Sequence, residues 1–366
     1  MHPSRLVAAL VVSATAASMS PAVSSVDSTL RRMNLKQKVG QLVMFAPAGH
    51  RLTQTEKDLM RRHHLGGVIL FADNYADRAQ LRSLTEQVQR VARSANELRI
   101  GALISADQEG GVVKRFPDMP PRYSHPQIGA SGDISLAYQQ GRATGRELRE
   151  AGVNVNLAPV ADLDLPPEHV MRSRSFGTRA RKVGRMTQAF ARGLQSRRTA
   201  ATAKHFPGLG GATINSDHGR AYVYRSKRQL HSIDAKPFHR AVAGGIRLIM
   251  LSHGIYVNDG GKRPASVNHY IATRRLRREF GFAGVAISDA LEPVAWRFGG
   301  STSRACKASI KAGVDVALIT GDVHAARSCA REIREAVRTG DIREARVNKA
   351  VLRVLDLKRW LGLLAP

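Results

Sequence analysis

Short, almost wholly apolar segments alternate with longer segments of helical periodicity along most of this chain. Continuously apolar runs of this kind are typical of parallel strands that are covered on both faces. Strand–helix alternation without a change in composition predicts an α/β fold, and eight such units predict a single-domain (β/α)8 TIM-type barrel. The expected strands are Gln41–Phe45, Gly67–Phe71, Ala102–Ala106, Val153–Pro159, Ala201–His205, Leu248–Ser252, Val285–Ser288 and Val314–Ile319.

The longer segments lie before the first strand, between the strands and after the last one. Their apolar residues recur every three or four positions, as they do in amphipathic helices that pack against a sheet. We expect the last of these helices to follow the eighth βα unit and to pack on the barrel. The clearest helices are Ser28–Val39, Arg78–Ala95, Leu136–Glu150, Ala180–Arg197, Lys227–Ala243, Val323–Thr339 and Arg343–Leu364.

The first residues have the features of an export signal. Arg5 precedes an apolar run of small residues, Leu6–Ala17, and small-residue cleavage sites follow it. We therefore expect a signal peptide over residues 1–24, a barrel domain over 25–366, and an exported protein that is secreted or associated with the cell wall. This run is too short to cross a bilayer, and no later stretch reaches the ~20 apolar residues required, so no transmembrane segment is expected.

The charge balance of the chain is strongly basic. Lys and Arg number 57 against 29 Asp and Glu, which gives a formal net charge of +28. Such an excess favours an anionic partner, such as an anionic cell-wall polymer, although charge spread evenly over the surface is the alternative. Aromatic residues make up 5% of the chain, and no nucleic-acid-binding motif accompanies the basic residues, so no nucleic acid is expected.

Two cysteines, Cys306 and Cys329, are present. In an exported protein they can form a disulfide, but two free thiols within helices fit the sequence equally well. Their spacing does not resemble a metal site, and a zinc-binding HExxH motif is absent from the sequence. A phosphate-binding GK[ST] motif and a GxSxG nucleophile motif are also absent. We therefore expect neither a metal nor an organic cofactor.

Ionisable residues follow five of the expected strands in succession. In a barrel of this kind the chemistry takes place at the C-terminal ends of the strands, so these side chains should gather on one rim. Carboxylates and arginines of such a rim suit a polyhydroxylated substrate, and two carboxylates can together hydrolyse a glycosidic bond. The residues are Asp107 and Glu109, Asp162, Lys204 and His205, His253, and Asp289.

Seven motifs occur in a characteristic order between Met33 and Leu363. They are GGVILF (66–71), DQEGGVVKR (107–115), NLAPVADLD (156–164), RSFG (174–177), KHFPGLG (204–210), LSHGIY (251–256) and ISDALE (287–292). Together they resemble the family 3 glycoside hydrolases, specifically the single-barrel β-N-acetylhexosaminidases of bacterial cell-wall recycling. Any one motif alone would be weak evidence, whereas the ordered set is specific.

The resemblance implies roles for individual residues. Asp289 matches the nucleophile, which would form a covalent glycosyl-enzyme intermediate and retain the anomeric configuration. Asp162 could contribute to the site directly, or it could cap the following turn or pair with an arginine. Glu109 is expected to support its neighbours by hydrogen bonding rather than to act in catalysis. The residues that match substrate-binding positions are Asp107, Arg115, Arg174, Lys204, His205 and, near the pocket, His253.

The sequence departs from the family in the loop that should carry the acid/base. There the resemblance implies a second His just after the KHFPG motif, and then Asp-Ser-His, but this chain has Leu209 and then Asn215-Ser216-Asp217. Asp217 occupies the position of the acid when the loop is aligned without gaps, and His218 follows directly. Either Asp217 or His218 could supply the proton from this glycine-containing loop. After the nucleophile, Ala290 replaces the usual Asp.

Three functions remain open at this point. The sequence favours a retaining exo-glycosidase that removes terminal β-linked N-acetylglucosamine from peptidoglycan fragments or chitooligosaccharides. The first alternative is a catalytically weakened, sugar-binding cell-wall protein on the same barrel, which the altered loop would explain. The second is a β-glucosidase of the same family. The presence of Asp289 favours an enzyme, because a binding protein needs no nucleophile.

Overall fold

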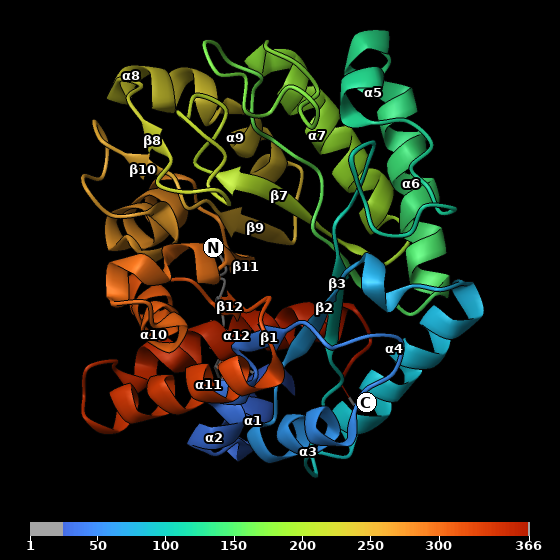
Figure 1. Ribbon diagram of the computed structural model, residues 1–366, viewed down its shortest axis with the longest axis vertical. Helices are drawn as coiled ribbons and strands as arrows, with labels where there is room; N and C mark the ends of the chain where they lie inside the picture. The colour runs from blue at the N-terminus through green and yellow to red at the C-terminus, as the bar shows by residue number, and fades with distance from the viewer. Residues whose placement is uncertain (1–24, 365–366) are drawn as a thin grey trace, which may run out of the picture.

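The computed structural model describes residues 25–364, so the predicted signal peptide lies outside the described residues. Its centre is a closed barrel of eight parallel strands (Figure 1). The order around the barrel is β1-β12-β11-β9-β7-β6-β3-β2. All eight predicted strands are present, and the prediction of a (β/α)8 barrel is confirmed. The strands are β1 (Val43–Phe45), β2 (Gly67–Leu70), β3 (Leu103–Ala106), β6 (Val155–Asn156), β7 (Ala200–Phe206), β9 (Leu248–Leu251), β11 (Val285–Ala290) and β12 (Val316–Leu318).

The fourth barrel strand, β6, is much shorter than predicted. Pro159 lacks a backbone N–H and cannot donate to a ladder, which favours an early end of the strand. Side-chain amides replace part of the missing backbone pairing with β3. Asn154 Oδ1 accepts from the N–H of Ile104 at 2.9 Å, and Asn156 Oδ1 accepts from the N–H of Gln108 at 3.0 Å. These two bonds therefore fix β6 to β3 and to Gln108, which follows β3 at the C-terminal end of the barrel.

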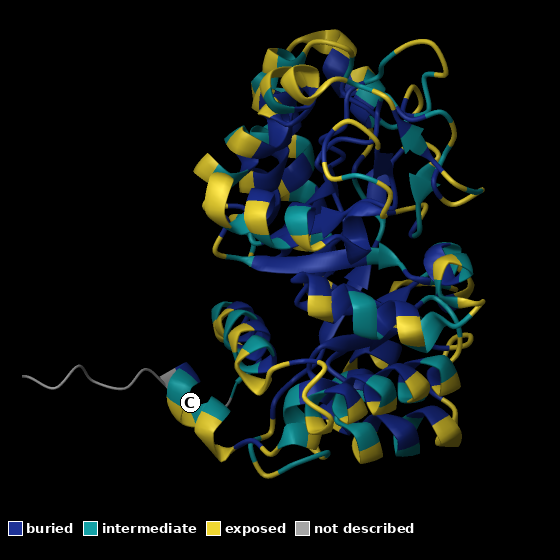
Figure 2. Ribbon diagram, turned by 90° about the vertical axis from the view of Figure 1, so that its left-hand side faces the viewer, coloured by how far each residue is buried: buried dark blue, intermediate teal, exposed yellow. Residues whose placement is uncertain are grey.

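Helices surround the barrel, with the exposed residues on their outer faces and the buried residues facing the strands (Figure 2). The predicted N-terminal helix is two helices, α1 (Ser25–Arg32) and α2 (Leu35–Gly40), because Asn34 caps the second by accepting from the N–H of Gln37 at 3.0 Å. The helices that follow successive barrel strands are α3 (Gln54–His63), α4 (Arg78–Arg93), α6 (Ile134–Glu150), α7 (Ala180–Gln195), α9 (Lys236–Ala243), η4 (Tyr270–Glu279), α10 (Thr302–Ala312) and α11 (Val323–Arg338).

The last helix, α12 (Glu344–Trp360), closes the N-terminal end of the barrel. Its Lys358 is buried, and the ammonium donates to the carbonyl of Gly66 at 2.9 Å and to Gln41 Oε1 at 2.5 Å. Burial lowers the pKa of Lys358 to about 7. These contacts join the end of the described chain to the segments that lead into β1 and β2.

Two small sheets lie outside the barrel and were not predicted. β4 (Gln108–Gly110) pairs with β5 (Val113–Lys114) in an antiparallel hairpin directly after β3. β8 (Tyr222–Val223) pairs with β10 (Ile255–Tyr256), which follows β9. Both follow the C-terminal ends of barrel strands, where they support the loops of the candidate site. The short elements around them are α5 (His125–Ser131), α8 (Lys227–Gln229), η1 (Ala72–Asn74), η2 (Leu230–Asp234), η3 (Ala265–Val267) and η5 (Glu292–Phe298).

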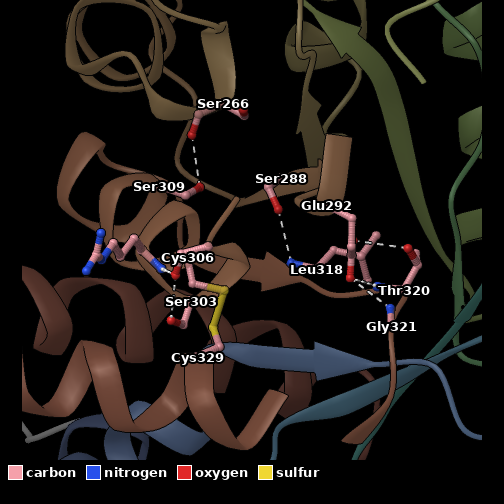
Figure 3. Close-up of a disulfide and its surroundings, with 12 residues drawn as sticks. Ser266, Ser288, Glu292, Ser303, Cys306, Ser309, Leu318, Thr320, Gly321 and Cys329 are labelled. Carbon is pink, nitrogen blue, oxygen red and sulfur yellow. Dashed lines mark hydrogen bonds between the residues drawn. A yellow bond between two sulfur atoms is a disulfide. The ribbon is translucent and has the colours of Figure 1, made fainter. Parts of the chain in front are cut away.

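The two cysteines form a disulfide in the structure (Figure 3). Cys306 of α10 and Cys329 of α11 are fully buried, and their Cα atoms are 5.7 Å apart. The sequence left this pairing open. The bond joins two neighbouring helices of the outer ring, those that follow β11 and β12.

Candidate active site

A cavity of about 300 Å³ lies at the C-terminal ends of the barrel strands. It brings together seven of the nine predicted site residues, from segments that are far apart in the sequence. His218 and His253 are not among the residues that line it. The lining residues are Ile69, Phe71, Asp107, Val113, Arg115, Leu157, Arg174, Lys204, His205, Asp217, Met250, Asp289, Ala290, Pro293, Leu318 and Thr320.

A network of alternating charges forms one wall of the cavity, with Lys204 at its centre. The Lys204 ammonium lies 2.5 Å from Asp107 Oδ1 and 2.7 Å from Glu109 Oε1. Arg174 binds Glu109 with two parallel hydrogen bonds of 2.7 and 3.0 Å. Arg115 lies 3.6 Å from Asp107 Oδ2. Each cation therefore has a carboxylate close by, and the side chains are held in place before any ligand binds.

The network fixes the ionisation of its buried members. Burial alone would raise the pKa of Glu109, but Lys204 and Arg174 hold it far below its usual range. Burial alone would lower the pKa of Lys204, but Asp107 and Glu109 raise it above its usual value. Glu109 therefore stays ionised, and Lys204 and Arg174 stay protonated, near neutral pH. Glu109 is 1% exposed, and its carboxylate contacts Lys204 and Arg174 without lining the cavity.

Asp289 lies near the end of β11 and faces the cavity. Its Oδ1 accepts from the N–H of Ala290 at 2.9 Å, and its Oδ2 lies 3.9 Å from His205 Nε2. Burial alone would raise the pKa of Asp289, but the positive charges around it, chiefly that of His205, lower the pKa below its usual value. Asp289 is therefore an ionised carboxylate with one oxygen held and the other directed at the cavity, which is the state that a nucleophile requires.

Asp162 orients His205 and does not line the cavity. This fully buried carboxylate accepts from the N–H of His205 at 3.0 Å and lies 2.6 Å from His205 Nδ1. Its second oxygen accepts from the N–H of Leu209 at 2.7 Å. The contact with the carboxylate places a proton on Nδ1 and directs Nε2 at Asp289. Of the alternatives for Asp162, the structure favours a capping role, since it anchors the loop after β7, but its partner is a histidine rather than an arginine.

The loop after β7 differs from the family pattern and presents Asp217 to the cavity. Asn215 shapes its turn: the side-chain oxygen accepts from the N–H of Asp217 at 3.1 Å, and the carbonyl accepts from the N–H of His218 at 3.0 Å. Both Asp217 and His218 are exposed, but Asp217 lines the cavity together with Asp289 and His218 does not. The Arg220 guanidinium stacks 4.1 Å from the ring of Trp296 in η5. This geometry favours Asp217 over His218 as the acid.

His253 lies beside the segment that carries Asp289 rather than in the wall of the cavity. Its Nε2 contacts the carbonyl of Ala290, and its Nδ1 lies 2.7 Å from Ser266 Oγ. Both ring nitrogens are therefore engaged by the protein, and the side chain is buried. His253 holds the residue that follows Asp289, and its predicted contact with substrate stays a prediction.

Glu292 supports the site and was assigned no role from the sequence, although it belongs to the quoted ISDALE motif. Its carboxylate accepts from the N–H groups of Thr320 and Gly321 at 2.9 and 2.8 Å and from the Thr320 hydroxyl at 3.1 Å (Figure 3). Ser288 Oγ accepts from the N–H of Leu318 at 3.0 Å. These bonds tie the nucleophile's segment to the loop after β12. A carboxylate three residues beyond the nucleophile was the available signal, but its partners are distant in sequence.

Within residues 25–364, no group of three or more His, Cys, Asp or Glu side chains is arranged to hold a metal ion. In the same range no helix combines the length and the apolar composition needed to cross a membrane. The ionisable residues that line the cavity are three carboxylates, a lysine, two arginines and a histidine, and Asp289 and Asp217 are among the carboxylates.

A closed barrel with an ionised carboxylate and a polar cavity at the C-terminal ends of its strands is the arrangement of a TIM-barrel enzyme. Comparison with known proteins makes this specific. Residues 34–357 match the model of the glycosyl hydrolase family 3 N-terminal domain. A β-hexosaminidase of Nitrosomonas eutropha is 34% identical over 287 residues, which cover 76% of this chain and 80% of that protein. This chain therefore belongs to glycoside hydrolase family 3.

Two solved structures show the same barrel. A family 3 β-N-acetylglucosaminidase from Paenibacillus sp. superposes with a TM-score of 0.85 at 32% identity, covering 90% of this chain and 63% of that one. This chain thus spans less than two thirds of the length of the Paenibacillus protein. A β-N-acetylhexosaminidase from Beutenbergia cavernae has a TM-score of 0.82 at 26% identity, covering 89% of this chain and 99% of that one.

Proposed function

We propose that this protein is a retaining exo-glycosidase that removes terminal β-linked N-acetylglucosamine from chitooligosaccharides or peptidoglycan fragments. The observation that carries the proposal is the position of Asp289, an ionised carboxylate that faces a polar cavity 3.9 Å from His205. The family and the described activities of the relatives above support it. The cavity volume of about 300 Å³ lies at the lower end of the range for small-molecule sites, about 300–1,000 Å³, which fits a single terminal sugar.

The reaction proceeds in two steps. Asp289 Oδ2 attacks the anomeric carbon, the glycosidic C–O bond breaks, and Asp217 donates its proton to the departing oxygen. The product is a glycosyl ester of Asp289 and a free alcohol. In the second step Asp217, now a carboxylate, takes a proton from water, and the water oxygen attacks the same carbon and releases Asp289. Two inversions restore the original anomeric configuration.

The charged network binds the sugar during both steps. Lys204, Arg174 and Arg115 offer N–H donors to the hydroxyl groups, and Asp107 offers an acceptor. Because Glu109 and Asp107 already hold these cations, little side-chain order must be gained when the sugar binds. His205 has its Nδ1 on Asp162, so its Nε2 is available to contact Asp289 or a substrate hydroxyl.

The altered loop supports a second candidate, a sugar-binding protein of weak catalytic power. Leu209 is buried at the position where the family resemblance implies a histidine, and Asp217 is exposed. Hydrolysis of 4-nitrophenyl N-acetyl-β-D-glucosaminide, compared with the matching β-glucoside, separates the candidates. Release from the N-acetylglucosaminide that disappears in Asp289→Asn supports the hexosaminidase. Preferred release from the β-glucoside supports a β-glucosidase of the same family. Folded protein that binds N-acetylglucosamine but releases nothing from either substrate supports the binding protein.

We also propose that the protein is exported and acts outside the cytoplasm, secreted or associated with the cell wall. The predicted signal peptide over residues 1–24 and the disulfide between Cys306 and Cys329 support this proposal, because stable disulfides belong to oxidising compartments. Sequencing the N-terminus of the protein recovered from the culture medium and from washed cell walls tests it. An intact Met1 terminus found in the cytoplasmic fraction alone would contradict export.

A further inference from the structure

A second and larger cavity, of about 820 Å³, lies away from the candidate active site. It is a groove between η4, the C-terminal end of α10 and the start of α12 (the last two are labelled in Figure 1). Gly313, before β12, lines this groove, whereas Thr320, after β12, lines the cavity of the active site. Strand β12 thus separates the two. The groove is lined by eight basic residues: Arg263, Arg277, Arg278, Lys311, Arg343, Arg346, Lys349 and Arg353.

At the base of the groove three guanidinium groups share one carboxylate. Asp315 is fully buried and pairs with Arg277, with Arg353 at 3.1 Å and with Arg346 at 3.3 Å. Three cations against one anion leave an excess of two positive charges. Burial lowers the pKa of Arg277 to about 10, and the neighbouring guanidiniums add to this effect while Asp315 opposes it. Arg277 therefore stays charged at neutral pH.

The inner arginines also have a structural role. Arg277 donates to the carbonyls of Phe282 and Gly284, and Arg346 donates to those of Ile310 and Val314. The bonds of Arg277 tie η4 to the loop that leads into β11, and those of Arg346 tie α12 to α10 and to the loop that leads into β12. They explain why Arg277 and Arg346 are present, but they leave the excess charge uncompensated.

The rim of the groove adds charge that has no structural explanation. Arg263, Arg278, Arg343 and Lys349 are exposed, and none of them has a carboxylate partner within residues 25–364. The one acidic residue in the lining, Asp341, already pairs with Lys311. A concave surface with charge of one sign concentrates ions of the opposite sign.

We propose that this groove binds a linear polyanion that carries repeated phosphate groups. Arginine and lysine together suit phosphate, because guanidinium donates in pairs and ammonium adds a compact charge. The groove volume lies within the range of about 300–1,000 Å³ found for multi-atom ligands and is far more than a single ion needs. No Phe, Tyr or Trp is among the described residues that line it, so it lacks the stacking platforms of single-stranded nucleic-acid sites.

Calorimetric titration of the purified protein with inorganic tripolyphosphate tests this proposal. We expect one site per chain, with affinity that falls as salt rises. Arg278→Gln/Lys349→Gln removes two rim charges that have no protein partner, and it should weaken binding about tenfold or more. Arg142→Gln/Arg192→Gln is the matched control, because these exposed arginines of α6 and α7 also have no carboxylate partner within residues 25–364 and lie outside the groove. This control should bind tripolyphosphate within about twofold of the unchanged protein.

Several results would overturn the proposal. Absence of binding would do so, and so would equal weakening in the control, because the attraction would then come from the whole surface. Inorganic phosphate that binds as tightly as tripolyphosphate would indicate a site for one ion, and poly-glutamate that binds equally would indicate carboxylates. Tighter binding of a single-stranded oligonucleotide, lost in the groove variant, would assign the groove to nucleic acid. All these readouts are independent of hydrolysis, so they stand whether or not the proposed glycosidase activity is found.

Discussion

The candidate active site and the basic groove both gather arginines and lysines, but they treat the charges differently. In the active site Lys204 and Arg174 lie against Asp107 and Glu109, at distances of 2.5 to 2.7 Å. In the groove one carboxylate, Asp315, forms ion pairs with three guanidinium groups. Four further cations at the rim have no carboxylate partner within the described residues. Paired charges position a neutral substrate, whereas unpaired charges attract an anion from a distance.

The largest effect is expected at the nucleophile. Asp289→Asn keeps the size of the side chain but removes the negative charge that attacks the anomeric carbon. We expect kcat for the aryl N-acetylglucosaminide to fall about 10⁴-fold or more, as it does when a nucleophile is lost elsewhere. Hydrolysis and urea denaturation measured side by side check this. Activity that stays within tenfold of the parent would remove Asp289 from its assigned role.

Glu109→Gln breaks the pairing in the active site. It leaves Lys204 and Arg174 buried around a neutral amide, and loss of one partner from a buried ion pair costs about 3–5 kcal/mol. The free energy of unfolding from urea denaturation measures this cost. A loss below about 1 kcal/mol would show that water reaches these cations and that the network is not preformed.

Asp217→Ala tests the choice of acid. A positioned acid contributes about 10²–10⁴-fold, but only to substrates whose leaving group needs a proton. We expect chitobiose hydrolysis to slow at least about 100-fold, with a much smaller effect on 2,4-dinitrophenyl substrates. With the 2,4-dinitrophenyl substrate, added azide should attack the glycosyl ester in place of the activated water, raise the rate and yield a glycosyl azide. His218→Ala is the matched control, and a larger loss there would move the role of acid to His218.

The pH dependence of stability follows from the same network. The folded-state pKa of Glu109 is lowered, so between its usual value of 4.5 and the lower folded value the unfolded chain binds more protons. Stability from this group is therefore complete above about pH 5 and is lost as the pH falls towards the folded pKa. Urea denaturation from pH 6 to pH 3 should show a fall that is clearly smaller in Glu109→Gln. Parallel curves would contradict the lowered pKa.

The smallest effect is expected in the groove. Asp341→Asn removes a carboxylate that is 38% exposed and pairs with Lys311, and exposed pairs contribute about 1 kcal/mol or less to stability. The same change raises the positive charge of the groove, so tripolyphosphate should bind about two- to threefold more tightly. Weaker binding after this change would mean that Asp341 orders the groove rather than opposes the ligand.

The sequence predicted what depends on local pattern. Each barrel strand is an apolar run, and each rim residue follows such a run, so the strand order and most of the cavity residues could be predicted. The shortness of β6 could not, because it depends on Asn154 and Asn156 bonding to β3 with their side chains. The supporting role of Glu292 could not be predicted from the sequence either, since its partners Thr320 and Gly321 belong to the loop after the next strand, β12.

The basic groove is the clearest example of a feature that could not be predicted from the sequence. Arg277, Asp315 and Arg346 are far apart in the sequence, in η4, directly before β12 and in α12. Net charge indicated an anionic partner but could not say where the charge is concentrated. That depends on how η4, α10 and α12 meet, which is a property of the closed barrel.

Lys358 has a consequence for the order in which the barrel can be completed. It lies near the end of the chain, yet it bonds to Gly66 and Gln41 before the first two strands. The seam of the barrel likewise joins β1 to β12. The growing polypeptide therefore lacks the partners that seal the barrel until the segment that carries β12 and α12 has been made.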